Sequence, residues 1–526
     1  MSAPYRRRSG ITAWLISVAL VATTLLEISP AQAVAGAPSV RLVSGSSKVT
    51  LKRPPNRRAY LDLGVYAAAV EGSFEIWASR PDYDTPVGLR QVVRSNGQIV
   101  ATYSLPETAK DPWNGLAKFF HVTVTNDAGA TILDRYHSFC PGAGELARVN
   151  DDGPSLTTYP QFCGGNPFTL GQVWGIDDGW ASNAFGYGSS DGIKGPDGHY
   201  TATVSIASAY QSLFGIPAAG AAVSVSVTVK TLKHGHCIPF CEGGANAGHH
   251  GRRERPRSSR SSVPLMTDPS PSVMPDLVAL PAWGITIDRQ RRTGRDYMDF
   301  GATVWDRGPS PMVVEGFRRP DGTPIMDGWE YFYANGVAVG RAPAGDLMWD
   351  GRPGHQHWHF EQFARYSLLA ADQTQVVRSE KTGFCLAPTD AIDMTLPGAE
   401  WDPYQVGLGT ACGGRSSIWT REVLPTGWGD TYFQGLPGQS FDITDLANGT
   451  YYIAVQANPD GALQEVSTAN NTELRQVILG GKPGHRTVEV PPWHGIDTEG
   501  GASTGGGGVP VPAPLPAMVG RRSAAL

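Results

Sequence analysis

The sequence predicts a mostly β protein built from two tandem β-sandwich-like domains. Glycine and proline are frequent, with 64 and 41 residues in a chain of 526, and few stretches repeat apolar residues at helical spacing. Strand patterns dominate instead, because Val223, Val225, Val227 and Val229 alternate with polar residues, as on a half-buried strand. Apolar residues make up 41% of the chain, which is enough to build cores, so general disorder is excluded.

The charge balance argues against a general nucleic-acid binder. The chain has 43 Lys and Arg residues against 48 Asp and Glu residues, which gives a formal net charge of −5. A protein that binds nucleic acid through its phosphates needs a basic surface. We therefore expect no nucleic-acid partner.

Residues 1–33 have the pattern of an export signal. Three arginines at 6–8 precede an apolar run over residues 11–26, and Ala-Gln-Ala at 31–33 provides the small residues that a signal peptidase requires. The run is shorter than the roughly 20 residues of a membrane-spanning helix. No later segment is long enough to span a membrane, so the mature protein is expected to be secreted, in the extracellular space.

Six cysteines in a secreted chain favour disulfides over free thiols. Other pairings are open, because sequence alone does not fix connectivity. Neighbours in the sequence suggest the pairs Cys140–Cys163, Cys237–Cys241 and Cys385–Cys412.

Composition divides the chain into two blocks. Residues 242–274 contain Gly, Ser, Pro and an arginine cluster but few apolar residues, which is typical of a disordered linker. Residues 481–526 are rich in Gly and Pro and are likewise expected to be a disordered tail. The strand signals fall in the two remaining blocks, 36–240 and 275–480.

The two blocks look like two copies of one plan. The first contains, in order, Phe139-Cys140, Cys163-Gly164-Gly165, Gly179-Trp180 and Gly198-His199-Tyr200. The second contains, in the same order, Phe384-Cys385, Cys412-Gly413-Gly414, Gly427-Trp428 and Gly449-Thr450-Tyr451. The spacings differ by only a few residues, as changes in loop length would produce. We therefore predict a duplicated β domain.

The strongest chemical signal is the run His355-Gln356-His357-Trp358-His359. On a strand, this spacing places all three imidazoles on one face, where a curved strand could direct them to one ion. Without an ion, three neighbouring imidazoles would repel one another when protonated and leave ring nitrogens unpaired, so a metal site is favoured. Three imidazoles suit Zn(II) with a bound water, or Cu(II), and the ligand set alone does not decide between them.

Further motifs follow this triplet in a characteristic order. They are Lys381-Thr382-Gly383-Phe384-Cys385-Leu386, Asp430-Thr431-Tyr432 and Asp442-Ile443-Thr444-Asp445. With the histidine triplet, their order and spacing resemble the catalytic domain of the lysyl oxidase family, whose members are copper- and quinone-dependent amine oxidases. The resemblance covers residues 275–480, which is under half of the chain.

This resemblance implies two cofactors. Copper, as Cu(II), would be bound by His355, His357 and His359. Lys381 and Tyr432 would be joined into the lysyl tyrosylquinone cofactor, which would make them the catalytic residues. A neutral lysine amine is a nucleophile and an oxidised tyrosine ring is an electrophile, so the chemistry suits these two residue types.

The family also has a structural calcium site, Ca(II) being held near the start and the end of the domain. The matching positions in this chain are Asp276, Leu277 through its carbonyl, Glu465, Asn470 and Asn471. All of them offer the hard oxygen donors that calcium prefers.

The activity that the resemblance implies is the oxidation of primary amines, including lysine in a protein substrate, to aldehydes. O₂ would be consumed, and ammonia and H₂O₂ would be released, with the cofactor carrying the electrons. Two alternatives stay open. One is a non-catalytic, metal-stabilised extracellular β-sandwich binding protein, and the other is a zinc-dependent hydrolase that uses the same histidines with an activated water.

The first block lacks the corresponding chemistry. Tyr136 stands at the position equivalent to Lys381, Ala184 stands at the position equivalent to Tyr432, and the block has no histidine triplet. We therefore expect residues 36–240 to be a degenerate, non-catalytic copy with a role in recognition, packing or dimerisation.

Overall fold

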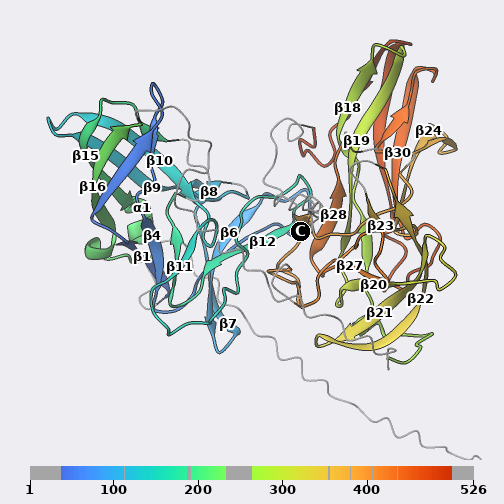
Figure 1. Cartoon of the computed structure of the whole chain (residues 1–526), viewed down its shortest axis with the longest axis horizontal. Coiled ribbons are helices and arrows are strands. Elements are labelled where there is room, and N and C mark those ends of the chain that lie inside the picture. Colours follow the sequence, from blue (N-terminus) through green and yellow to red (C-terminus); the bar gives the residue numbers. More distant parts are fainter. Residues whose placement is uncertain are drawn as a thin grey trace, which may run out of the picture.

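The computed structural model describes residues 37–499, apart from residues 112, 186–190, 233–262, 353–355, 380, 404–406, 435 and 437. Nearly all regular structure in these residues is β-strand, and the α-helix found there, α1 (Ser208–Leu213), is a single short element. Figure 1 shows two bodies of packed strands, the first coloured blue to green and the second yellow to red. The predicted fold class, mostly β with two sandwich-like blocks, is confirmed.

Three predictions fall wholly outside the described residues. They are the export signal at 1–33, the Cys237–Cys241 pair and the metal ligand His355. Within the described part of the chain, no helix has both the length and the apolar composition needed to cross a membrane.

The first block contains three main sheets and a short pair of strands. Sheet one has the order β1 (Ser39–Ser44), β4 (Val65–Val70), β13 (Trp180–Asn183), β11 (Leu146–Arg148). Sheet two has the order β10 (Thr131–Phe139), β9 (Gly115–Asn126), β15 (Gly198–Ile206), β16 (Ala222–Thr231), β2 (Lys48–Arg53), with β8 (Lys110–Asp111) beside β9. Sheet three has the order β12 (Gly171–Ile176), β5 (Phe74–Ser79), β6 (Gly88–Ser95), β7 (Gln98–Ser104), and β14 (Gly192–Ile193) pairs with β3 (Ala59–Tyr60). Two 3₁₀ turns complete the block, η1 (Glu107–Ala109) and η2 (Ala218–Gly220).

The second block also contains three sheets. The first has the order β17 (Leu277–Ala279), β19 (Arg295–Asp306), β28 (Trp428–Tyr432), β26 (Asp390–Ala391), with β18 (Trp283–Gln290) and β29 (Ser440–Asp442) also on β19. The second has the order β23 (His357–Phe360), β22 (Val337–Asp350), β21 (Ile325–Ala334), β20 (Met312–Arg318), β27 (Trp419–Leu424). The third has the order β25 (Gln375–Arg378), β24 (Ala364–Ala370), β30 (Gly449–Ala457), β31 (Thr472–Lys482), β32 (His485–Glu489), and a 3₁₀ turn, η3 (Pro271–Val273), precedes β17.

The strands of the two blocks are connected in the same order. The sheet β1-β4-β13-β11 matches β17-β19-β28-β26, and β12-β5-β6-β7 matches β27-β20-β21-β22. The hairpin β9–β10 and its partners β15 and β16 likewise match β24–β25 with β30 and β31. A disulfide follows the hairpin in each block, Cys140–Cys163 in the first and Cys385–Cys412 in the second. The two blocks thus share this strand order, and the duplication itself stays a prediction.

The second block starts earlier and ends later in the sequence than predicted. Residues 263–274, assigned to the linker, are described, and Leu265 forms a β-bridge with Arg341. The second block also continues past residue 480, because β31 turns into β32 and the described chain extends to Glu499. The ordered part of the second block extends to this region because the Trp493 ring packs against Phe168 of the first block. Glycine and proline are frequent here because the chain turns, and composition alone does not distinguish turns from disorder.

The two blocks share a hydrophobic core. Trp77, Val92, Tyr159 and Val173 of the first block belong to the same buried cluster as the strands of the second. Such a shared core means that burying apolar surface between the blocks stabilises both of them.

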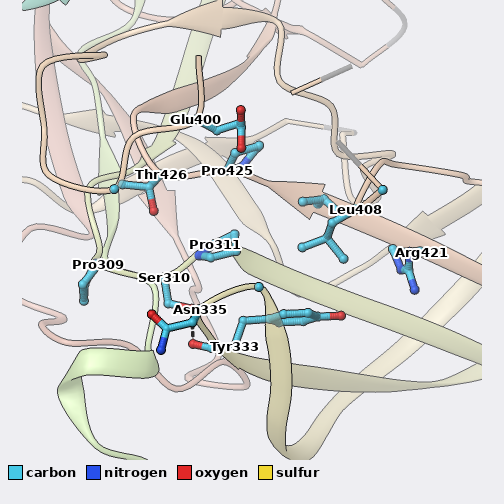
Figure 2. A pocket seen from close by; sticks show the side chains of 14 residues that line it. Pro309, Ser310, Pro311, Tyr333, Asn335, Glu400, Leu408, Arg421, Pro425 and Thr426 are labelled. Atoms are coloured by element: carbon cyan, nitrogen blue, oxygen red, sulfur yellow. Dashed lines mark hydrogen bonds between the residues drawn. The ribbon is translucent and has the colours of Figure 1, made fainter. Parts of the chain in front are cut away.

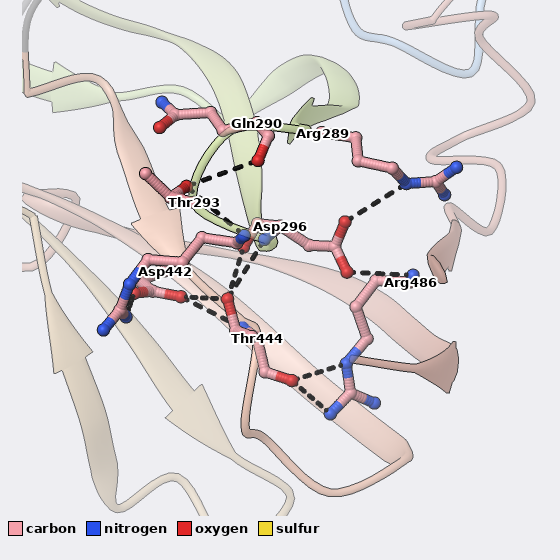
Figure 3. A network of polar contacts seen from close by, with 8 residues as sticks. Arg289, Gln290, Thr293, Asp296, Asp442, Thr444 and Arg486 are labelled. Atoms are coloured by element: carbon pink, nitrogen blue, oxygen red, sulfur yellow. Dashed lines mark hydrogen bonds and ion pairs between the residues drawn. The ribbon is translucent and has the colours of Figure 1, made fainter. Parts of the chain in front are cut away.

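The Asp442-Ile443-Thr444-Asp445 motif anchors strands that are distant in sequence (Figure 3). Asp296 on β19 is fully buried, and its backbone N–H donates to Thr444 Oγ1 at 3.0 Å. Its carboxylate accepts hydrogen bonds from Arg289 Nε at 3.3 Å and from the backbone N–H of Arg486 at 3.2 Å. The Arg486 guanidinium donates in turn to the Thr444 carbonyl, and Thr444 Oγ1 donates to Asp442 Oδ1 at 2.6 Å. The motif is therefore structural.

We expect Thr444→Val to destabilise the chain by about 1–3 kcal/mol, because the buried backbone N–H of Asp296 would lose its acceptor. Thr444→Ser keeps the hydroxyl and is the matched control. Urea unfolding followed by tryptophan fluorescence measures the difference, and a valine variant as stable as wild type would contradict this role for the motif.

Candidate metal and cofactor site

Two of the three predicted histidine ligands are described, and they lie side by side. His357 and His359 occupy alternate positions of β23, so both rings are on one face of the strand, with centroids 4.7 Å apart. His357 is half-buried and His359 is buried. His359 Nδ1 lies 3.5 Å from Asp350 Oδ2 on the neighbouring strand β22. His355 lies outside the described residues.

The residue between the two histidines serves packing. Trp358 points to the opposite face of β23, where it is fully buried, and its Nε1 donates to the Gly414 carbonyl at 3.0 Å. This contact fixes the strand and therefore the direction of both imidazoles. Two convergent imidazoles fit Cu(II), which prefers nitrogen donors. Among the residues that the structure describes, no group of three His, Cys, Asp or Glu side chains is placed to hold one metal ion.

The structure brings Lys381 and Tyr432 together. Lys381 lies in the loop after β25 and Tyr432 is the last residue of β28, so 51 positions of sequence separate two side chains that touch. Lys381 Nζ lies 4.4 Å from the centroid of the Tyr432 ring, and the side chain is only 4% exposed. The ring of Phe384 packs edge-on against Tyr432 with centroids 5.0 Å apart, and it forms a wall of the same small space.

A disulfide connects the histidine strand to this pair. Cys385 and Cys412 are bonded. The Cys385 carbonyl accepts a hydrogen bond from the Tyr432 hydroxyl at 3.2 Å, and the Cys412 carbonyl accepts one from the backbone N–H of Trp358 at 3.1 Å. The bridge therefore joins the segment that holds the phenol to the segment that lies beside the imidazoles.

Burial controls the ionisation of the amine. Burial lowers the pKa of Lys381 to about 8, because the ammonium form loses its hydration. The Asp430 carboxylate opposes this shift most strongly, since it attracts the ammonium. A substantial fraction of Lys381 is therefore neutral near pH 8, which an exposed lysine is not.

Sequence reasoning assigned no role to two buried acids beside this amine. Glu422 on β27 and Asp430 on β28 are both buried, and burial raises the pKa of each carboxyl well above its usual range. Glu422 Oε2 accepts the N–H of Leu386 at 3.1 Å, whereas Glu422 Oε1 and Asp430 Oδ2 have no hydrogen-bond partner in the described structure. An acid directly before the apolar pair Val423-Leu424 was the available sequence signal for Glu422. A third acid, Glu361, has its pKa raised to about 7 by burial, while Lys381 opposes the shift.

Comparison with known proteins identifies the family of this region. Residues 331–486 match the family model described as Lysyl oxidase. The C-terminal block contains a lysyl oxidase domain. The match begins within β21, so β17 to β20 precede the matched part of the lysyl oxidase domain.

Individual relatives agree with the family match. Lysyl oxidase homolog 4 of Mus musculus is 30% identical over 140 residues, which is 26% of this chain and 16% of that protein. Protein-lysine 6-oxidase of Sus scrofa is 31% identical over 125 residues, which is 23% of this chain and 44% of that protein. The Homo sapiens protein of the same name is 31% identical over 125 residues, which is 26% of its length. The chain thus spans less than half the length of these relatives.

The equivalent positions of the first block do not form such a site. Tyr136 is 54% exposed and stacks on His121, with ring centroids 4.4 Å apart. Ala184, by contrast, is buried in the core. At these two positions the first block thus has neither a buried amine nor a phenol in contact with one.

The five predicted calcium positions gather at the start and end of the second block. Asn470 Nδ2 donates to Asp276 Oδ1 at 3.2 Å, and Asn471 Nδ2 donates to Glu465 Oε1 at 2.6 Å. Glu465 Oε2 accepts the N–H of Leu277 at 3.0 Å. The amide oxygens of both asparagines are buried without a hydrogen-bond partner, as donors to an ion would be. The arrangement fits a hard cation.

Two further acids lie beside this cluster. Asp306 and Glu330 are fully buried, and burial raises the pKa of each to about 8. The charge of Asp276 further raises the pKa of Asp306, and the charge of Glu465 further raises the pKa of Glu330. Their position inside or at the end of apolar strands was the sequence signal for them, and only the fold shows their proximity to the predicted ligands.

A separate cavity of about 650 Å³ lies on the other face of β27 (Figure 2). Arg421, which alternates with Glu422, lines it together with Tyr333, Leu408 and Thr426. The Arg421 guanidinium already donates to Glu315 at 2.9 Å. The cavity contains neither the histidines nor the amine–phenol pair, so it is not the candidate site.

We expect the full chain to unfold at a higher temperature in Ca²⁺ than in EGTA. An ion that binds only the folded state stabilises it by about 2.7 kcal/mol at a free concentration of 100 times its Kd. Asp276→Asn should reduce this shift, whereas Asp268→Asn, at an exposed carboxylate nearby, should leave it unchanged. Equal melting temperatures of the wild-type protein in both buffers would contradict a calcium role.

Proposed function

We propose that this chain is a secreted, copper-dependent amine oxidase whose organic cofactor forms from Lys381 and Tyr432. Its substrates would be primary amines, including lysine side chains of proteins, which it would convert to aldehydes with release of ammonia and H₂O₂. The observation that carries the proposal is the buried contact of Lys381 Nζ with the Tyr432 ring, 4.4 Å from its centroid. The lysyl oxidase domain and the two disulfides formed outside the linker support it.

The histidines provide the metal site in this proposal. His357 and His359 would hold the ion with His355, and Trp358 keeps the strand that carries them in place. Copper held there would supply the redox chemistry for oxidation of the Tyr432 ring by O₂, and the finished cofactor would supply the electron sink for amine oxidation.

The chain's own residues prepare the amine for bond formation. Burial holds Lys381 partly neutral at neutral to mildly alkaline pH, and only the neutral amine has a free electron pair. Phe384 and the disulfide segment confine Lys381 and Tyr432 in contact, so little further ordering is needed when the bond forms. Asp430 stands beside both side chains and can hold the proton that Lys381 releases.

The alternatives assign no role to this contact. A zinc hydrolase would use the histidines and a bound water, and a non-catalytic binding module would use the ion only for stability. Neither requires a buried, partly neutral lysine on a half-buried phenol ring. The linked peptide separates the proposed function from both alternatives.

We expect mass spectrometry of copper-loaded full-length protein to find a Lys381–Tyr432 linked peptide. Lys381→Arg should abolish that peptide and retain copper, because the imidazoles are unchanged. His357→Ala should lose copper and the linked peptide, because one missing imidazole leaves an incomplete site. Lys482→Arg, at an exposed lysine, is the control. Full amine oxidation by Lys381→Arg would exclude the proposed cofactor.

We also expect the rate of linkage to rise with pH. The reactive species is the neutral amine, and the pKa of Lys381 is lowered to about 8, so the rate should increase through about pH 8 and then level off. Asp430→Asn should move the midpoint to lower pH, because Asp430 is the charge that most raises this pKa. The charges of Asp350, Glu361 and Arg352 also shift the pKa of Lys381, and the Asp430→Asn substitution leaves these three residues in place. Timed quenching followed by peptide analysis measures the rate, and a pH-independent rate would contradict this assignment.

A further inference from the structure

Strand β28 carries the groups of the candidate site on one face. Trp428, Asp430 and Tyr432 occupy alternate positions, so their side chains point to the same side of the strand. Trp428 is fully buried at one end of this row, and Tyr432 lies at the other. A shift of the strand at Trp428 would therefore move the Tyr432 ring relative to Lys381.

The backbone beside β28 is hydrogen-bonded to the first block. Ala391 pairs with Trp428, and Ile392 N–H donates to the Gly427 carbonyl at 2.9 Å. On its other side, the Ile392 carbonyl accepts the N–H of Gly171 at 3.1 Å. The Gly171 carbonyl then accepts the N–H of Met394 at 3.0 Å. An isolated parallel β-bridge between Gly171 and Asp393 thereby joins the start of β12 in the first block to the segment that follows β26, the neighbour of β28.

Aromatic side chains of the first block pack against the same region. The Phe162 ring lies edge-on to Trp428, with centroids 5.7 Å apart. Tyr159 stacks on Trp401 at 5.6 Å, and the Arg94 guanidinium lies 5.4 Å from the centroid of the same indole. Contacts of this kind each contribute to an interface beyond the apolar area that they bury.

The backbone contact leaves no room for a side chain at Gly171. A Cβ there would lie 2.3 Å from Asp393 Oδ1 and 2.7 Å from Thr395 Cγ2. Asp393 Oδ1 is itself held by the N–H of Thr395 at 2.9 Å, so it is not free to move away. Gly171 is thus fitted to the edge of the second block.

We propose that the first block positions β28, with Gly171 and Phe162 as positioning residues that keep Tyr432 against Lys381. Gly171 holds the backbone next to the strand, and Phe162 holds the Trp428 end of the row of side chains. The chemical consequence rests on the proposed function, whereas the support of β28 does not. The first block, which has no such site of its own, then supports the site in the second block.

The test compares Gly171→Val and Phe162→Ala with wild type, all as full-length copper-loaded protein. Hydrogen exchange of β28 amides should become about tenfold faster in Gly171→Val, because the neighbouring backbone bonds open more often. Exchange of β30 should stay unchanged. The yield of the Lys381–Tyr432 linked peptide at a fixed time should fall about tenfold, as expected when reacting groups lose their alignment. Phe162→Ala should act in the same direction with a smaller effect.

Two matched variants serve as controls. Gly88 lies in the same row as Gly171, since both pair with Ser79, and a Cβ at Gly88 meets nothing closer than 3.7 Å. Phe185 is half-buried like Phe162 and packs on the core of the first block alone. Gly88→Val and Phe185→Ala should therefore match wild type in β28 exchange and in linked-peptide yield.

The outcomes separate this inference from the proposed function. If β28 exchange in both positioning variants equals that of the controls, or if β30 accelerates equally, the positioning role is wrong. If wild type forms no linked peptide while Gly171→Val still accelerates β28 alone, the proposed function fails and the support of β28 stands.

Discussion

The contact between the Lys381 amine and the Tyr432 ring is the interaction on which the candidate site depends. The two residues come from different segments, and Phe384 contacts both of them. The hairpin β24–β25 delivers the lysine, β28 delivers the tyrosine, and the Cys385–Cys412 bridge fixes the loop between them. Burial follows from this convergence, and burial gives the amine its lowered pKa. The chemistry is thus a consequence of how three segments pack.

The sequence predicts the fold class and the members of the site better than it predicts boundaries and surroundings. Alternating valines mark β16 because strand periodicity is local, and the Cys385–Cys412 pairing follows from proximity in the chain. The end of the second block was misplaced, since Trp493 is ordered by a ring of the other block. Glu422 was missed for a similar reason, because its distance from Lys381 is set by the packing of two sheets. Local patterns cannot report such contacts.

The two blocks show how one strand order can be put to different uses. Both keep the same sheets and a disulfide after the same hairpin. In the first block an exposed tyrosine and a buried alanine replace the amine and the phenol. Strand β12 of that block uses its free edge for the neighbouring block instead. An unpaired edge is normally a liability for aggregation, and here the second block bonds to the Gly171 end of that edge.

The Cys385–Cys412 bridge also links the maturation of the site to its surroundings. Thiol–disulfide exchange in a reducing cytoplasm keeps such a pair open, and the bridge closes only where oxidants prevail. While the bridge is open, only non-covalent contacts hold the loop that carries Cys385 to the segment beside β23. In the proposed amine oxidase, the redox state of the compartment would thereby act as a checkpoint, which would withhold a reactive electrophile until the polypeptide had left the environment rich in free amines and thiols where it was synthesised.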